Sequence, residues 1–187
     1  PNVYPSYQKV TDSTAQSKFQ DAWGVSLPLE EGMKIPEILD AAEAGALHAL
    51  YVIGENPMTS DPDLNHVRKV LQNIEFLIVQ DIFFTETGQY ADVILPAASF
   101  VEKEGTFTNT ERRLQRVRKA IDSPGEAKPD SWIIVEIAKR LLALGAAKPD
   151  EAAPFGSWEH RTPSEVMTEI NAVSPFYAGV TYERIEA

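Results

Sequence analysis

Two short apolar runs, each followed by a polar turn, constrain the fold of this chain most strongly. The first run covers residues 49–53 and leads into the turn 54–57; the second covers 76–79 and leads into Gln80-Asp81. Between them the apolar residues have helical spacing: Leu64, Val67, Val70 and Leu71. A strand–helix–strand unit of this kind is half of a nucleotide-binding α/β sheet. Since ligands gather at the carboxyl ends of such strands, we expect function at these two turns.

The composition excludes several classes of function. The chain has 187 residues, 43% of them hydrophobic, which suffices for one sizeable domain core. Its 28 Asp and Glu exceed its 17 Lys and Arg, and the net charge of −11 argues against general nucleic-acid binding. The absence of cysteine excludes disulfides, thiolate metal sites and a cysteine nucleophile. His48, His66 and His160 lack metal-ligand spacing, so we predict no metal site. No residues form a nucleophile–base pair, so we predict no catalytic residue in this chain.

The chain shows no targeting or membrane signal. No apolar run approaches the roughly 20 residues that a membrane helix requires. The amino terminus begins at Pro1, without an initiator Met and without a basic-then-apolar signal pattern. We therefore expect a cytoplasmic segment without a membrane span, cut from a larger protein.

Periodicity and capping residues outline the remaining elements. They predict a helix over 16–23 ended by Gly24, a helix over 35–42, a helical turn at 85–90 and a strand at 93–95. Ser60 or Asp61 is the expected N-cap of the helix that contains Leu64. Residues 97–128 lack clear periodicity, and an irregular stretch of this length tends to be functional.

Two helices are expected in the last third of the chain. Asp130 opens one that ends near Gly145, and a capping box at Thr162 opens the other. The tail from Ser174 has no evident partner. The element order predicts an α/β fold: a Rossmann-like open, mainly parallel sheet with helices on both faces. We expect residues 1–187 to form a single α/β domain segment, with 1–34 and 174–187 as packing extensions.

The two turns hold side chains that could bind a ligand. Gly54 allows a positive φ and close backbone approach, and Asn56 can both donate and accept hydrogen bonds. Ser60, if it caps a helix, stands where amide groups favour a pyrophosphate. A tight turn followed by an N-cap explains the same residues equally well.

Asp81 also has two interpretations. Its carboxylate can accept hydrogen bonds from ribose hydroxyls or from guanine, or it can cap the following turn. Asp130 has a similar capping interpretation. The cations of the segment 112–119 have three interpretations. They form a solvated or interdomain face, they bind a phosphate, or they pair with nearby glutamates. The chain contains neither a Gly-rich dinucleotide fingerprint nor a P-loop.

Longer stretches of the sequence resemble a known family. These are YVIGENPMTSDPD, FLIVQDIFFTETGQYADVILPAASFVEKEGTFTNTERRLQRVRKA and PGEAKPDSW. They are similar to the molybdopterin-dependent oxidoreductases, and most of all to the catalytic alpha subunit of formate dehydrogenase. The terminal stretches PNVYPSYQKV and SPFYAGVTYERIE extend the resemblance over essentially the whole chain.

The resemblance implies a segment of a larger enzyme that helps bind a bis(molybdopterin guanine dinucleotide) cofactor. The parent enzyme would oxidise formate to carbon dioxide at molybdenum or tungsten. Carried over by position, the cofactor-binding residues are Gly54, Asn56, Ser60, Gln80, Asp81, Ile82, Ala97 and Asp130.

The same resemblance places the metal ligand, the active-site residues and the iron–sulfur cluster outside this chain. It implies the remaining domains of the parent subunit and electron-transfer subunits as partners, and an isolated chain without activity. Two alternatives keep the fold: a cofactor-free scaffold domain of a large electron-transfer complex, and a related molybdopterin reductase that acts on nitrate or another oxoanion.

Overall fold

A computed structural model describes residues 2–146 and 158–187, which belong to two compact units. The sheet unit comprises residues 33–99 and 123–129. The hairpin unit comprises the described parts of 1–32, 100–122 and 130–187. The expectation of a single domain segment stays a prediction.

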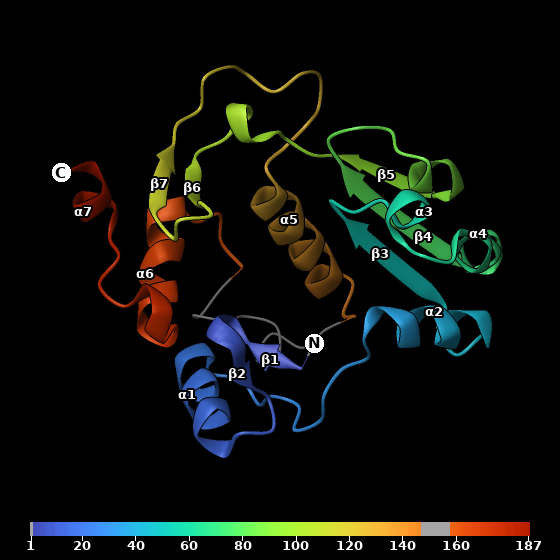
Figure 1. Cartoon of the computed structure of the whole chain (residues 1–187), viewed down its shortest axis with the longest axis horizontal. Helices are drawn as coiled ribbons and strands as arrows, with labels where there is room; N and C mark the ends of the chain where they lie inside the picture. The colour runs from blue at the N-terminus through green and yellow to red at the C-terminus, as the bar shows by residue number, and fades with distance from the viewer. Residues whose placement is uncertain (1, 147–157) are drawn as a thin grey trace. The chain divides into compact units, whose positions relative to one another are not determined.

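The sheet unit is built on three parallel strands in the order β3-β4-β5, which Figure 1 shows side by side. They are β3 (Ala49–Ile53), β4 (Phe76–Asp81) and β5 (Val93–Pro96). The prediction that β4 ends before Gln80 is wrong. Gln80 pairs with both Ile53 and Leu95, and Asp81 pairs with Pro96, so the ladder continues for two more residues. The polar pair therefore lies on the strand, where its backbone is held rigidly.

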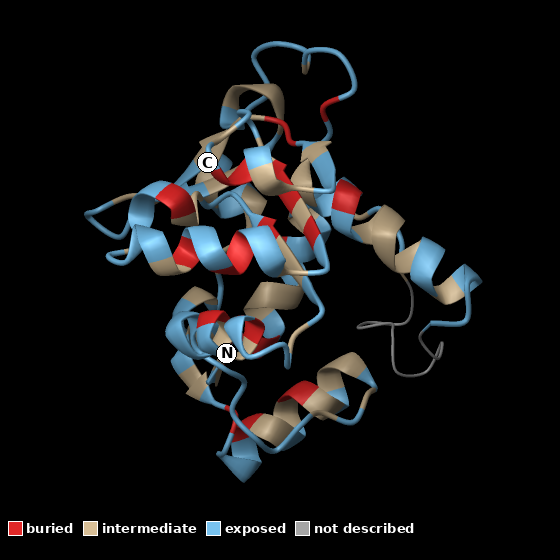
Figure 2. Ribbon diagram, turned by 90° about the vertical axis from the view of Figure 1, so that its right-hand side faces the viewer, coloured by how far each residue is buried: buried red, intermediate tan, exposed pale blue. Residues whose placement is uncertain are grey.

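Four helical segments accompany this sheet: α2 (Ile35–Glu43), α3 (Pro57–Ser60), α4 (Leu64–Asn73) and η2 (Thr87–Tyr90). Their apolar positions pack with alternate residues of β3 and β4, including Val52, Leu77 and Val79, in one buried cluster. Figure 2 shows buried segments in red at intervals along the helices. The predicted α/β fold with an open parallel sheet is confirmed. Helices on the second face of the sheet stay a prediction.

The start of α4 differs from the prediction. The N-cap is Asp63, whose carboxylate accepts a hydrogen bond from the backbone N–H of His66 at 3.1 Å. Ser60 is instead the last residue of α3, and Asp61 is its C-cap. Pro57 explains the difference, because a proline suits the first position of a helix and here begins an additional short turn.

The hairpin unit begins with β1 (Val3–Tyr4), η1 (Pro5–Tyr7), β2 (Gln8–Lys9) and α1 (Ser13–Trp23). It continues with η3 (Phe100–Glu102), β6 (Gly105–Thr108) and β7 (Leu114–Val117). Its later elements are α5 (Asp130–Ala143), α6 (Pro163–Val173), η5 (Pro175–Tyr177) and α7 (Tyr182–Glu186). A second buried cluster joins Tyr4, Val10, Ala15, Phe19 and Val173, which fixes the amino-terminal segment to the end of α6.

Two predictions about this unit are wrong. The stretch 97–128 is not irregular throughout, because β6 and β7 form an antiparallel hairpin (Figure 1). The tail from Ser174 has partners, since α7 contacts β7. Short polar strands such as these depend on cross-strand pairing, which leaves little trace in periodicity.

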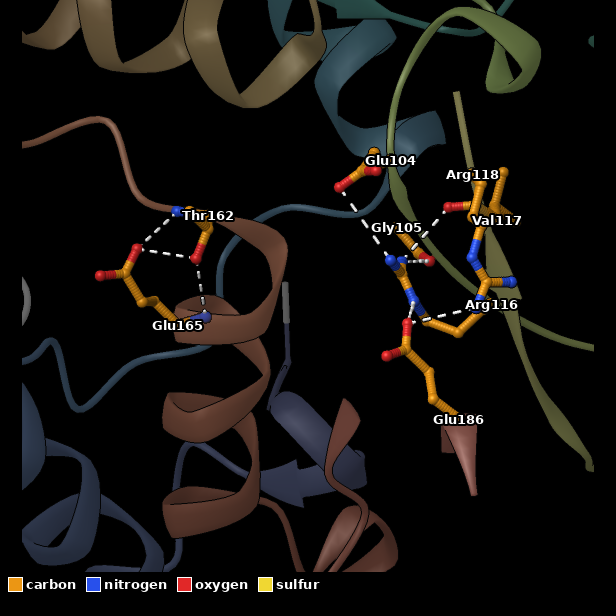
Figure 3. A network of polar contacts seen from close by, with 8 residues as sticks. All are labelled: Glu104, Gly105, Arg116, Val117, Arg118, Thr162, Glu165 and Glu186. Carbon is orange, nitrogen blue, oxygen red and sulfur yellow. Dashed lines mark hydrogen bonds and ion pairs between the residues drawn. The ribbon is translucent and has the colours of Figure 1, made fainter. Parts of the chain in front are cut away.

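Arg116 on β7 is the centre of the contact between the hairpin and α7 (Figure 3). Its Nε donates to Glu186 Oε1 at 2.8 Å, and one terminal nitrogen donates to the carbonyl of Gly105 at 2.9 Å. The guanidinium also lies over the ring of Tyr182, 4.3 Å from the centroid. Of the three interpretations of this basic segment, pairing within the chain holds for Arg116, with Glu186 as its main partner.

Candidate functional site

The carboxyl edge of the sheet brings together the predicted site residues of the sheet unit. The backbone N–H of Gly54 donates to the carbonyl of Gln80 at 2.8 Å. On the other side of β4, the N–H of Ala97 donates to the carbonyl of Asp81 at 3.0 Å. These two bonds join the ends of all three strands into one continuous edge.

Gly54 has the backbone conformation that the sequence suggested. Its φ is +61°, in the left-handed region that side-chain-bearing residues rarely adopt. A Cβ atom built on Gly54 would have no other atom within 4 Å. The glycine is therefore required by its backbone angle, and the space beside it is open.

Asp81 caps the turn that follows β4 and keeps further acceptor capacity. Its Oδ1 accepts the backbone N–H of Phe83 at 3.1 Å, which matches the capping interpretation. The residue is partly exposed, and the described residues provide no hydrogen bond to its Oδ2. The adjacent Ile82 is 48% exposed and adds an apolar surface beside the carboxylate. The capping interpretation of Asp81 is thus confirmed for one oxygen, and ligand binding by the other oxygen stays a prediction.

Gln80 and Ala97 are buried parts of the same edge. The side chain of Gln80 is fully buried, and its Oε1 accepts the hydroxyl of Tyr51 on β3. Ala97 is 6% exposed and forms a parallel bridge with Lys128. The N–H of Ala98 donates to the carbonyl of Lys128 at 2.8 Å, so the segment before α5 extends the edge beyond β5. Both residues shape the edge from within.

The side chains of Asn56 and Ser60 form hydrogen bonds within the sheet unit. The Oδ1 atom of Asn56 accepts from the hydroxyl of Thr87 at 2.7 Å, and its Nδ2 donates to Glu86 Oε2 at 2.7 Å. The hydroxyl of Ser60 donates to Glu55 Oε1 at 2.6 Å. Since Ser60 does not cap α4, the argument for an anion site at a helix amino terminus is wrong for this residue.

Glu55, Glu86 and Thr87 were assigned no binding role from the sequence. Hydrogen bonds from Ser60 and from the N–H of Asn56 lower the pKa of Glu55. A hydrogen bond from the side chain of Asn56 lowers the pKa of Glu86. The contacts of Asn56 with Glu86 and Thr87 depend on the fold, because these residues lie far apart in the sequence and meet only when the strands are in register.

Asp130 is the predicted site residue that lies in the hairpin unit. It is the first residue of α5, so the predicted helix start is confirmed while its capping role stays a prediction, and its carboxylate forms an ion pair with Lys103. The Asp130 side chain is 38% exposed, so the carboxylate remains partly accessible to solvent. The sequence had not indicated Lys103 as its partner.

Comparison with known proteins identifies the family. The family model for molybdopterin oxidoreductase matches residues 2–140. The chain belongs to the molybdopterin oxidoreductase family. Among curated relatives, the alpha subunit of F420-dependent formate dehydrogenase 1 from Methanococcus maripaludis is 47% identical over 186 residues. This alignment covers 99% of the chain and 25% of that subunit.

Two further matches are another curated relative and one solved structure. The alpha subunit of F420-dependent formate dehydrogenase from Methanocaldococcus jannaschii is 45% identical, over 100% of this chain and 26% of the relative. The chain thus spans about a quarter of the length of these curated relatives. In the solved structure of acetylene hydratase from Pelobacter acetylenicus, 23% of that chain superposes on 92% of this one with a TM-score of 0.56 and 20% identity. This likeness supports the fold.

Two other features are absent from the described residues. No helix there has the length and hydropathy to span a membrane. In the same residues, no three His, Asp or Glu side chains converge in a way that could hold a metal ion.

Proposed function

We propose that this chain is a segment of a formate dehydrogenase alpha subunit and that its sheet edge helps hold a bis(molybdopterin guanine dinucleotide) cofactor. Family membership and the names of the relatives support the parent activity, oxidation of formate to carbon dioxide. The observation that carries the binding role is the edge itself. It combines the open backbone at Gly54 with the partly exposed carboxylate of Asp81.

The residues of this edge fit a guanine dinucleotide. Asp81 Oδ2 can accept hydrogen bonds from guanine N–H groups or from ribose hydroxyls. Gly54 lets a ligand approach the backbone closely, and the exposed Ile82 offers an apolar surface to a flat base. Gln80 and Ala97 support the edge from within. Asp130 stays in the proposed set as a carboxylate of the second unit, with Lys103 as its counterion.

Asn56 and Ser60 remain in the proposed set in a different capacity. Their side chains already form hydrogen bonds within the sheet unit, Asn56 with Glu86 and Thr87 and Ser60 with Glu55, so they shape the backbone around Gly54. Such internal bonds leave their polar atoms less available to a ligand than those of Asp81.

In this proposal the cofactor and this segment have different roles in the reaction. The bound cofactor would supply the molybdenum or tungsten centre for the two-electron oxidation of formate, and this segment would orient its dinucleotide end. The metal ligand, the iron–sulfur cluster, the remaining domains and the electron-transfer subunits belong to the rest of a cytoplasmic enzyme in this proposal. The isolated segment would be inactive.

The proposal is tested by Asp81→Asn in the full-length protein. The measured quantities are GMP released by acid hydrolysis per polypeptide and formate-dependent reduction of a viologen dye. Loss of a hydrogen bond to a charged group costs about 1.5–3 kcal/mol, so we expect retention of the dinucleotide to weaken by about tenfold or more. Both readouts should fall together.

Glu75→Gln is the matched control for this experiment. Glu75 immediately precedes β4, at the opposite end of the strand, and its side chain is 70% exposed beside His48. This variant should retain its GMP. A full complement of GMP in Asp81→Asn would refute the proposed site. An intact protein without pterin or metal would instead indicate the scaffold alternative, and turnover of nitrate without formate oxidation would indicate the oxoanion reductase.

A further inference from the structure

A single side chain, Asn56, connects the turn after β3 to the segment after β4. Its Oδ1 accepts two hydrogen bonds from Thr87, one from the N–H at 3.2 Å and one from the hydroxyl at 2.7 Å. Its Nδ2 donates to Glu86 Oε2 at 2.7 Å. We call this three-residue arrangement of Asn56, Glu86 and Thr87 the Asn56 clamp.

The chemistry of the partners fixes the orientation of the Asn56 amide. The Thr87 N–H can only donate, and an ionised Glu86 carboxylate can only accept. An amide turned by 180° would place Nδ2 against the Thr87 N–H and Oδ1 against the carboxylate. Hydrogen bonding from Asn56 also lowers the pKa of Glu86, which favours the ionised form that the clamp requires. The clamp therefore has one satisfied arrangement.

Thr87 anchors the clamp in the interior of the sheet unit. The residue is fully buried, and its Oγ1 also accepts the backbone N–H of Met58 at 3.2 Å. One hydroxyl thus serves both the turn and the first residues of α3. A buried polar group that loses its partner is costly, so removal of this hydroxyl would release the turn at two points.

We propose that Glu86 and Thr87 are positioning residues for the dinucleotide site, acting through Asn56 on the backbone at Gly54. This inference rests on the proposed function. In it, the amide of Asn56 does not touch the dinucleotide; it holds the turn 54–57 beside the end of β4. The carboxylate of Asp81 and the open backbone of Gly54 then keep a fixed separation, which a bound dinucleotide requires.

An exchange of donor and acceptor tests this assignment in the full-length protein. Asn56→Asp places a carboxylate oxygen where Nδ2 now faces Glu86, and two like charges in contact repel. In the double variant Asn56→Asp, Glu86→Gln, the new glutamine amide at position 86 donates to the new carboxylate at position 56. The hydrogen bond is restored with its direction reversed. Glu55 is identical in all the variants, so its charge cancels in the comparison.

We expect about a tenfold loss of GMP content, or a tenfold faster release of GMP, in Asn56→Asp. Glu86→Gln alone should stay within about twofold of the wild type, because the glutamine Oε1 still accepts from Asn56. The double variant should also return to within about twofold of the wild type. Amide hydrogen exchange over residues 54–60 should follow the same order.

The outcomes separate this inference from the proposed function. A double variant as defective as Asn56→Asp overturns the inference, because an amide that touches the dinucleotide directly would be lost in both proteins. If amide hydrogen exchange over residues 54–60 changes among the variants while their GMP content stays constant, the positioning role is also overturned. A wild-type protein without GMP refutes the proposed function itself, and the positioning role with it.

Thr87→Val and Thr87→Ser provide a second, independent pair. Valine keeps the shape of threonine but removes the hydroxyl, and serine keeps the hydroxyl. We expect Thr87→Ser to retain GMP within about threefold of the wild type and Thr87→Val to lose about tenfold. Equal GMP retention by the two variants would overturn the role of Thr87, provided that both remain folded by circular dichroism.

Discussion

Gly54→Ala isolates the energetic contribution of one backbone angle at the sheet edge. Gly54 has a φ of +61°, and an added Cβ would meet nothing within 4 Å, so the substitution introduces strain without a clash. The left-handed conformation costs a residue with a side chain about 1–2 kcal/mol. Alanine also reduces the conformational entropy of the unfolded chain, which offsets part of this cost, so a net loss of about 1 kcal/mol of stability is expected. This corresponds to about a fivefold shift in the local opening equilibrium.

Amide hydrogen exchange is the appropriate assay. The three tryptophans of the chain, Trp23, Trp132 and Trp158, belong to the hairpin unit, whereas Gly54 belongs to the sheet unit. Peptides that cover residues 49–54 and 76–81 include both partners of the bond from the Gly54 N–H to the Gln80 carbonyl. In the full-length protein their protection should fall about fivefold.

Two further substitutions control for the added atoms. Gly105 has an unstrained φ and the same open space around a built Cβ, so Gly105→Ala should leave exchange over β6 and β7 nearly unchanged. Gly54→Asn should cost less than Gly54→Ala, because asparagine adopts the left-handed region more readily. Protection in Gly54→Ala equal to that in the wild type would refute the argument that the edge depends on this angle.

Two predictions concern the hairpin unit. Thr162→Ala removes the N-cap of α6 and should destabilise that helix by about 1 kcal/mol, measured by hydrogen exchange over residues 163–173. Hydrogen bonds from the Thr162 N–H and hydroxyl lower the pKa of Glu165 below its ordinary value of 4.5. The stability that the ionised Glu165 adds to α6 is therefore complete above pH 4.5 and is lost as pH falls through the lower pKa of the folded state. Protection of α6 should decrease in acid, and less so in Glu165→Gln; an identical pH dependence in both proteins would contradict this reasoning. Arg116→Lys keeps the charge but cannot reproduce the bonds to Glu186 and Gly105 together with the stacking on Tyr182, so α7 should become more accessible to limited proteolysis. Arg118→Lys is the control, since Arg118 is 64% exposed and bonds Glu186 at 3.3 Å; equal cleavage of the two variants would count against the role of Arg116.

The elements that sequence patterns predicted well are those with local signals. Helix α6 carries its capping box and proline within a few residues, and β3 is a short apolar run with a glycine directly after it. The inner stripe of α4 likewise follows from helical spacing within one segment. Each signal lies inside the element that it specifies, so no knowledge of the fold is needed to read it.

The elements that were predicted wrongly depend on contacts with other parts of the chain. The length of β4 depends on its pairing with β3 and β5, and the position of the α4 N-cap depends on the additional turn at Pro57. The hairpin of β6 and β7 and the contact of α7 with β7 also join segments that are distant in sequence or individually weak in periodicity.

The sequence by itself determined the α/β class, the positive φ available at Gly54 and the placement of a carboxylate at the end of a strand. These follow from residue type and local spacing. Only the tertiary structure decided how the polar groups of that edge are shared: Asp81 caps a turn with one oxygen, and Asn56 is bound by Glu86 and Thr87. A hydrogen bond requires two groups within about 3 Å, and for groups far apart along the chain only the packed fold brings them that close.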